Sequence, residues 1–148
     1  CDRRQRQMCI RDRYKAVNEY RQKFPQKAVT FYAQNYPAMG WAVFMAGGSC
    51  PVIPCTDKAF LKDAAAMEVE ETNTDEYKKM VKSDIGSIIY SKSGTEIPVQ
   101  LSSGKYVLKY IHPASGKIET INKSLKINGL YNLKVPDKKE GIYWFHKL

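Results

Sequence analysis

The spacing of hydrophobic positions changes near the middle of the chain. Up to about Glu71, apolar residues stand in short runs or at helical spacing, whereas from Thr72 onward they alternate with polar residues. The first pattern is typical of helices and fully buried elements, and the second is typical of strands with one face in a core. The sequence therefore predicts two regions of different architecture, 14–71 and 72–148.

Three elements are expected at the start of the first region. Tyr14–Lys23 has helical spacing, and Ala38–Ala46 is apolar nearly all round, which predicts a buried helix. Between them, Ala28–Ala33 is an apolar run of β-branched and aromatic residues without polar alternation, which indicates a strand buried on both faces. Because such a strand needs neighbours for its backbone groups, we expect partner strands outside this chain.

The first region closes with an expected amphipathic helix from Asp57 to about Glu70. Thr56 offers an N-cap hydroxyl, and an apolar stripe begins at Phe60. We expect the acidic side chains of this helix, Asp63 among them, to face water.

Seven short strands are expected in the second region, separated by turns rich in Gly, Pro, Asn and Ser. Such spacing favours an antiparallel β-sandwich, and Pro98 favours an edge position for its strand. In the last strand, Tyr143–Phe145 places aromatic residues on both faces. One face is expected to close the sandwich core and the other to pack on the helix that begins at Asp57; a sugar-stacking platform is the alternative. The expected strands are 77–82, 85–90, 97–101, 106–110, 117–121, 131–135 and 142–146.

The first thirteen residues have a character of their own. Met8–Asp12, read back into codons, resembles the end of an adapter used in sequencing libraries, so 1–13 is expected to be artefactual or disordered. The alternative is a basic N-terminal arm. On the first interpretation, the natural protein begins far upstream and the present chain is a carboxyl-terminal fragment.

The charge pattern changes this picture little. The formal net charge is +9, but the lysines of the second region are scattered as on a solvated sheet face, so nucleic-acid binding is not expected. No apolar run approaches the roughly 20 residues of a membrane span. Cys50 and Cys55 are too few ligands for a structural zinc site, and either a small disulfide loop or two free thiols fits them. Neither a metal nor a cofactor is expected.

Several stretches resemble the end of secreted bacterial glycoside-hydrolase-like proteins. The resemblance lies in Phe31–Ala33, Gly40–Ser49 and Phe60–Ala65, and then in Tyr106–Gly116 and Gly141–Phe145. It implies an α+β chain: a remnant of the last β/α units of a (β/α)8 barrel in 14–71, followed by an antiparallel β-sandwich of the collagen-binding type in 72–148. It also implies a polysaccharide or oligosaccharide partner and a secreted, periplasmic or cell-surface location.

The resemblance also places a candidate substrate-binding loop. In a barrel of this type, substrate lies at the carboxyl ends of the strands. The corresponding residues here are Gln34, Asn35 and Tyr36, with Tyr32 and Trp41 as aromatic faces for sugar rings. The alternative is that Tyr32 and Trp41 are core residues and that the amides merely form a turn.

No catalytic residue is assigned. Glycosidases need two carboxylates beside the scissile bond, yet Glu19 is the only carboxylate between Tyr14 and Pro54, and Gln34 stands where a glutamate would be useful. We therefore expect the fragment to be inactive by itself, its sandwich bracing the barrel. The rival interpretation is a β-sandwich module that binds carbohydrate or another extracellular polymer.

Overall fold

The structure is a computed structural model, and it describes residues 3–30, 37–55, 57–137 and 139–148. The chain divides into two compact units, Cys1–Pro54 and Cys55–Leu148. The helix that follows Pro54 therefore belongs with the strands, and the boundary lies earlier than the expected one between residues 71 and 72. Each unit is described by itself below.

The first unit is built on two helices, α1 (Arg3–Lys23) and α2 (Pro37–Met45). Helix α1 begins at Arg3 rather than at Tyr14, so it runs through the segment that was expected to be foreign or disordered. Its buried residues Tyr14 and Val17 form part of the core of this unit. The expected buried helix is confirmed in α2, where residues 40–46 are all buried.

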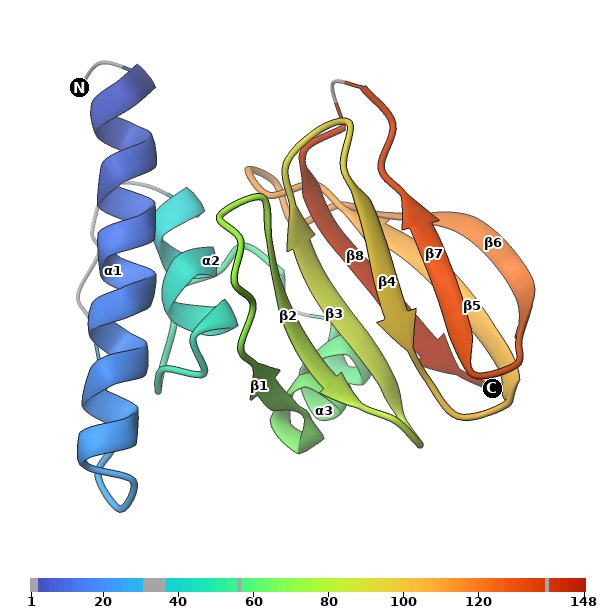
Figure 1. The fold of residues 1–148 in the computed structure, drawn as a ribbon, viewed down its shortest axis with the longest axis horizontal. Coiled ribbons are helices and arrows are strands. Elements are labelled where there is room, and N and C mark those ends of the chain that lie inside the picture. The colour runs from blue at the N-terminus through green and yellow to red at the C-terminus, as the bar shows by residue number, and fades with distance from the viewer. Residues whose placement is uncertain (1–2, 31–36, 56, 138) are drawn as a thin grey trace. The chain divides into compact units, whose positions relative to one another are not determined.

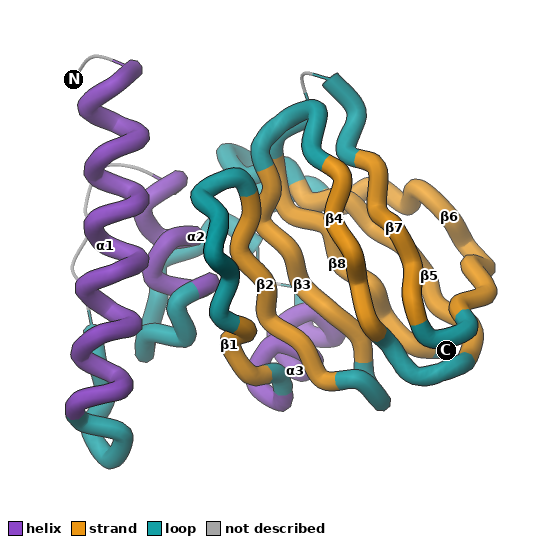
Figure 2. Tube along the Cα trace, in the orientation of Figure 1, coloured by secondary structure: helices purple, strands orange, loops and turns teal. Residues whose placement is uncertain are grey.

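The segment after α1 differs from its expected structure. Residues Ala28–Thr30 form no strand, and Ala28 and Thr30 are exposed while Val29 is half-buried. Figure 2 shows this part of the chain as loop. The prediction of a buried strand is therefore wrong for 28–30, and the rest of the predicted strand, 31–33, lies outside the described residues.

Helix α3 (Lys58–Ala66) opens the second unit. Its N-cap is Asp57, whose side chain accepts a hydrogen bond from the Phe60 N–H at 2.8 Å; the expected cap, Thr56, lies outside the described residues. The helix ends earlier than predicted, because Met67 is extended and the chain enters a short strand, β1 (Glu68–Glu70).

The seven strands expected from alternation are confirmed. Their bounds are close to those predicted except in β6, which continues to Ile127 instead of ending at residue 121. Together with β1 they form two antiparallel sheets, in the orders β1-β2-β3-β8-β5-β6 and β4-β7. The unit is therefore α+β, with few helices and mainly antiparallel strands. The strands are β2 (Tyr77–Lys82), β3 (Gly86–Ser91), β4 (Glu96–Gln100), β5 (Gly104–Ile111), β6 (Ile118–Ile127), β7 (Leu130–Lys134) and β8 (Gly141–Lys147).

A hydrophobic core fills the space between the two sheets, which gives a sandwich-like arrangement (Figure 1). Ile97, Val99 and Leu133 enter it from the two-stranded sheet, and Leu108 and Phe145 enter it from the six-stranded sheet. This two-layer core explains the alternation seen in the sequence, because alternate side chains of strands such as β4, β5 and β8 point into it.

Pro98 occupies the edge position expected for it. It lies in β4, which pairs with β7 alone. Proline has no backbone N–H to donate, and an edge strand tolerates this because it pairs on one side only.

Candidate functional site

The residues proposed from the sequence for sugar binding fall mainly in a part of the chain about which nothing is described. Tyr32, Gln34, Asn35 and Tyr36 lie outside the described residues. Trp41 is described and is 0% exposed; its ring meets that of Phe44 edge to face, with centroids 5.5 Å apart. This placement agrees with the alternative in which Trp41 is a core residue.

The most ordered polar arrangement lies in the second unit, on the face of the large sheet opposite the sandwich core. Strand alternation sends Tyr143 and Phe145 into that core, so Trp144 between them points to the other face. There Trp144 meets Phe60 of α3 edge to face, at 5.4 Å between centroids. The prediction that one aromatic face of the last strand packs on this helix is therefore confirmed, and the residue on that face is Trp144.

Asp63 of α3 lies at the centre of this contact. Its Oδ2 accepts a hydrogen bond from Trp144 Nε1 at 2.9 Å, and His146 Nδ1 lies 2.7 Å from the same oxygen. Asp63 is only 7% exposed. The expectation that its side chain faces water is wrong, because the helix turns this carboxylate toward the sheet.

Sequence reasoning missed Asp63 for a definite reason. Asp63 follows Phe60 by one helical turn and precedes Ala64 directly, so it lies at the border of the apolar stripe. A residue at this border can face either solvent or the interior. Its two partners are more than eighty positions away along the chain. The signal that existed was a tryptophan on the helix-covered face of the last strand, which needs a hydrogen-bond acceptor when buried.

The chemistry of the three side chains follows from their donors and acceptors. An ionised carboxylate only accepts hydrogen bonds, so the hydrogen between Asp63 and His146 is carried by Nδ1 of the imidazole. Lys109 of β5 places its Nζ 4.2 Å from the centroid of the Trp144 ring, a cation–π contact. We call Phe60, Asp63, Lys109, Trp144 and His146 the Asp63 cluster.

An Asp–His pair is also the orienting part of a hydrolytic triad. That chemistry requires a hydroxyl or thiol at the second imidazole nitrogen. Within the described chain, the hydrogen bonds of His146 bring only Asp63 to its ring. Nor do the described residues contain a group of three or more His, Cys, Asp or Glu that could hold a metal ion. The Asp63 cluster therefore has the features of a structural contact between α3 and the sheet.

A second polar arrangement holds the loop before β8. The hydroxyls of Tyr143 and Tyr110 donate to the backbone oxygens of Lys139 and Glu140, at 2.9 and 2.8 Å, and the hydroxyl of Tyr90 donates to the Glu140 carboxylate. Burial raises the pKa of Tyr143 to about 12 and also raises the pKa of Tyr110 and Tyr90, the latter strengthened by the Glu140 carboxylate.

Close to this loop, His112 and Glu119 form a pair at the surface. His112 Nε2 lies 2.9 Å from Glu119 Oε1, and this hydrogen bond lowers the pKa of the Glu119 carboxyl. The ring of His112 also meets that of Tyr110 edge to face at 4.8 Å. The pair orients an imidazole on the surface of the second unit.

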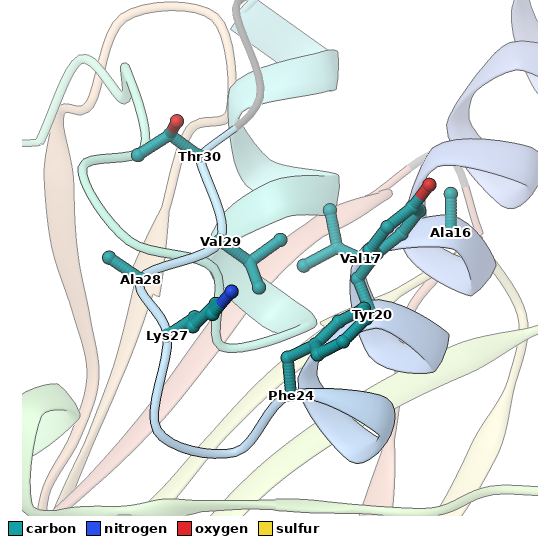
Figure 3. A pocket seen from close by; sticks show the side chains of 8 residues that line it. All are labelled: Ala16, Val17, Tyr20, Phe24, Lys27, Ala28, Val29 and Thr30. Carbon is teal, nitrogen blue, oxygen red and sulfur yellow. The ribbon is translucent and has the colours of Figure 1, made fainter.

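In the first unit, an open apolar groove of about 410 Å³ separates α1 from the segment that follows it (Figure 3). Tyr20 and Phe24 form one side with stacked rings whose centroids are 6.2 Å apart. The sequence signals for this groove were the four-residue spacing of these two aromatic residues at the end of α1 and directly after it, and the apolar residues Ala28 and Val29. The lining residues are Ala16, Val17, Tyr20, Phe24, Lys27, Ala28, Val29 and Thr30.

The two cysteines of the Cys-Pro-Val-Ile-Pro-Cys stretch are free thiols in the structure. Cys50 is exposed, and Cys55 is buried, which raises the pKa of its thiol. Of the two possibilities left open by the sequence, the structure thus has the pair of thiols. The described helices include none long and apolar enough to cross a membrane.

Two of the comparisons with known proteins, one with family models and one with solved structures, give matches. A family model described as "Domain of unknown function (DUF6298)" matches residues 2–67. A solved structure titled "Glycoside hydrolase" is similar to this chain with a TM-score of 0.41 and 14% identity, over 56% of this chain and 20% of that one. This chain thus spans about a fifth of that structure's length. A search of curated proteins gives no match.

The family match bears on the start of the chain. It begins at residue 2 and so includes most of the segment that resembles an adapter. Neither this match nor the continuous helix α1 supports the adapter interpretation. The match ends at residue 67, directly after α3, although α3 packs on the sheet of the second unit.

Proposed function

We propose that this chain is the carboxyl-terminal part of a secreted carbohydrate-processing protein of the glycoside-hydrolase type, in which the second unit is a brace without catalytic activity. On this proposal, residues 14–71 derive from the last units of a (β/α)8 barrel, and an oligosaccharide or polysaccharide meets the loop Gln34–Tyr36. The class of substrate rests on the resemblance of Gly40–Ser49, Phe60–Ala65 and Gly141–Phe145 to the ends of such proteins.

The observation that carries the bracing role is the position of Asp63. Helix α3 directly follows the first unit along the chain, and its one buried carboxylate binds Trp144 and His146 of the last strand. On this proposal, a helix held in this way fixes the point at which the preceding chain enters the second unit. Hydrogen bonds to a charged group contribute about 1.5–3 kcal/mol each, and a buried partner left without its acceptor costs more than the bond itself.

The same geometry disfavours the rival, a carbohydrate-binding module built on the last strand. Sugar rings stack on aromatic faces that are open to solvent, but Trp144 is 0% exposed and covered by Phe60 and Lys109. Its N–H, which would donate to a sugar hydroxyl, is already bound to Asp63. The aromatic side chains of the last strand are therefore used within the fold.

A glycan titration of the whole chain tests the proposal. We expect amide NMR shifts of residues 55–148 to stay unchanged when a panel of plant and host oligosaccharides is added at about 1 mM, a concentration that detects even weak binding. Shifts confined to the neighbourhood of Gln34–Tyr36 would support the proposed loop. Shifts within the second unit that disappear in Trp144→Phe would replace the brace with the binding module.

A further inference from the structure

The groove beside α1 has a surface that a folded unit normally covers. Tyr20 of α1 is 58% exposed and Phe24, which directly follows α1, is 37% exposed, although their rings stack on each other. From the opposite side, Val29 points toward Val17 across the hollow (Figure 3). Large exposed apolar side chains gathered around a hollow mark interaction sites more often than single exposed ones do.

The charges around this groove are of one sign. Lys27 lines it, with its Nζ 5.5 Å from the centroid of the Phe24 ring, and Lys23 Nζ lies 5.6 Å from the same centroid. No carboxylate is among the lining residues, and Glu19, the nearest acid along α1, is not one of them. The groove therefore favours a partner with apolar side chains and at least one negative charge.

The backbone of the groove is suited to strand pairing. Ala28–Thr30 has a strand-forming composition but is not part of a sheet. Its one backbone hydrogen bond within the described chain is the 2.7 Å bond that the Val29 oxygen accepts from the Ser49 N–H. The remaining N–H and C=O groups of these three residues are available to a strand laid alongside.

We propose that this groove binds an extended peptide segment from outside this chain, carrying alternating apolar side chains and an acidic residue, which adds to Ala28–Thr30 as a strand. Its backbone bonds the free groups of Ala28–Thr30, its apolar side chains cover Tyr20 and Phe24, and its carboxylate meets Lys27. Strand addition of this kind takes affinity from main-chain hydrogen bonds and specificity from the pockets for alternate side chains.

Two other occupants fit these observations less well. A small apolar anion would match the aromatic rings and Lys27 but would leave the backbone of Ala28–Thr30 unpaired. A second copy of the chain would bring Lys23 and Lys27 of one copy toward the same lysines of the other. A separate acidic, strand-forming peptide satisfies the rings, the charge and the backbone together.

Fluorescence anisotropy with a labelled hexapeptide, Glu-Val-Thr-Val-Thr-Glu, tests the proposal on the whole chain. We expect saturable binding. It should weaken at least about tenfold when proline replaces the second valine of the peptide, and likewise when lysine replaces both glutamates. Lys27→Glu and Tyr20→Ala, both at exposed positions, should weaken binding to a similar degree. Lys58→Glu, an exposed charge reversal on α3, is the matched control and should leave binding unchanged.

Three results would overturn the proposal. The first is no binding up to about 1 mM peptide. The second is that the peptide with proline binds as tightly as the original peptide. Backbone pairing would then not contribute, and the groove would be assigned to an apolar anion. The third is a dimer in sedimentation that dissociates in Tyr20→Ala, which would assign the groove to a second copy. Circular dichroism of each variant shows whether the fold is retained.

Discussion

At the scale of single residues, the contact between α3 and the last strand depends mainly on Asp63. A carboxylate that is 7% exposed is costly unless its oxygens are bound, and here one oxygen is bound by Trp144 and His146. The same contact gives buried Trp144 the acceptor that its N–H requires. One side chain thus satisfies two groups of the last strand, which explains why an acid is tolerated on the buried face of α3.

The tyrosines that hold Lys139 and Glu140 lead to a prediction about alkaline pH. Because burial raises the pKa of Tyr143 from its usual value near 10 to about 12, the folded state retains this proton longer than the unfolded state. The resulting stabilisation is complete below about pH 10 and is lost as the pH rises toward 12. Between pH 9 and 12, the free energy of unfolding measured in urea should decline less steeply for Tyr143→Phe than for the wild type. Parallel declines would contradict this account of Tyr143.

Residue roles of this kind were only partly predictable. The packing of Trp144 on a helix follows from its position on an alternating strand, since the neighbouring aromatic residues already fill the sandwich core. The burial of Asp63 does not follow, because a helix-border acid is compatible with solvent and interior alike. Only the long-range contact with the last strand decides between the two.

At the scale of elements, strand alternation was the most reliable signal. Six of the seven strands of period 2 are close to their predicted bounds because one face of each meets a single core, whereas the mostly exposed β6 continues well beyond its predicted end. Two predictions failed where local pattern and tertiary contact differ. The expected helix to Glu70 ends at Ala66, since Met67 turns into β1, and Ala28–Thr30 has strand composition but no strand beside it.

Gly86 provides a test of the contact between β3 and β8. Its φ is +152°, and a Cβ there would lie 1.8 Å from the carbonyl oxygen of Phe145. Gly86→Ala is therefore expected to lower the free energy of unfolding by more than about 2 kcal/mol. At Gly104 the nearest atom is the Cε of the flexible Lys147 side chain at 3.2 Å, so Gly104→Ala should change stability by less than about 1 kcal/mol. Equal urea midpoints for the two variants would show that the close approach at Gly86 is relieved without cost.

At the scale of the whole molecule, the division of the chain between Pro54 and Cys55 differs from the change of pattern in the sequence near residue 71. Pattern reveals where the period changes, but unit membership is decided by contacts, and α3 makes its contacts with the sheet. The family match to residues 2–67 includes α3 as well. Helix α3 is therefore part of the second unit by its contacts, although it lies within the range of the family match.

Native-state hydrogen exchange of the α3 amides, compared between the wild type and Asp63→Asn, tests this claim most directly. We predict that α3 in the wild type exchanges together with β8, and that Asp63→Asn lowers the protection of α3 about 10- to 100-fold while β3 and β8 retain theirs. Asp84→Asn, an exposed acid in the turn before β3, should leave all of these rates unchanged. Exchange of α3 independently of β8 in the wild type, or protection unchanged in Asp63→Asn, would contradict the account.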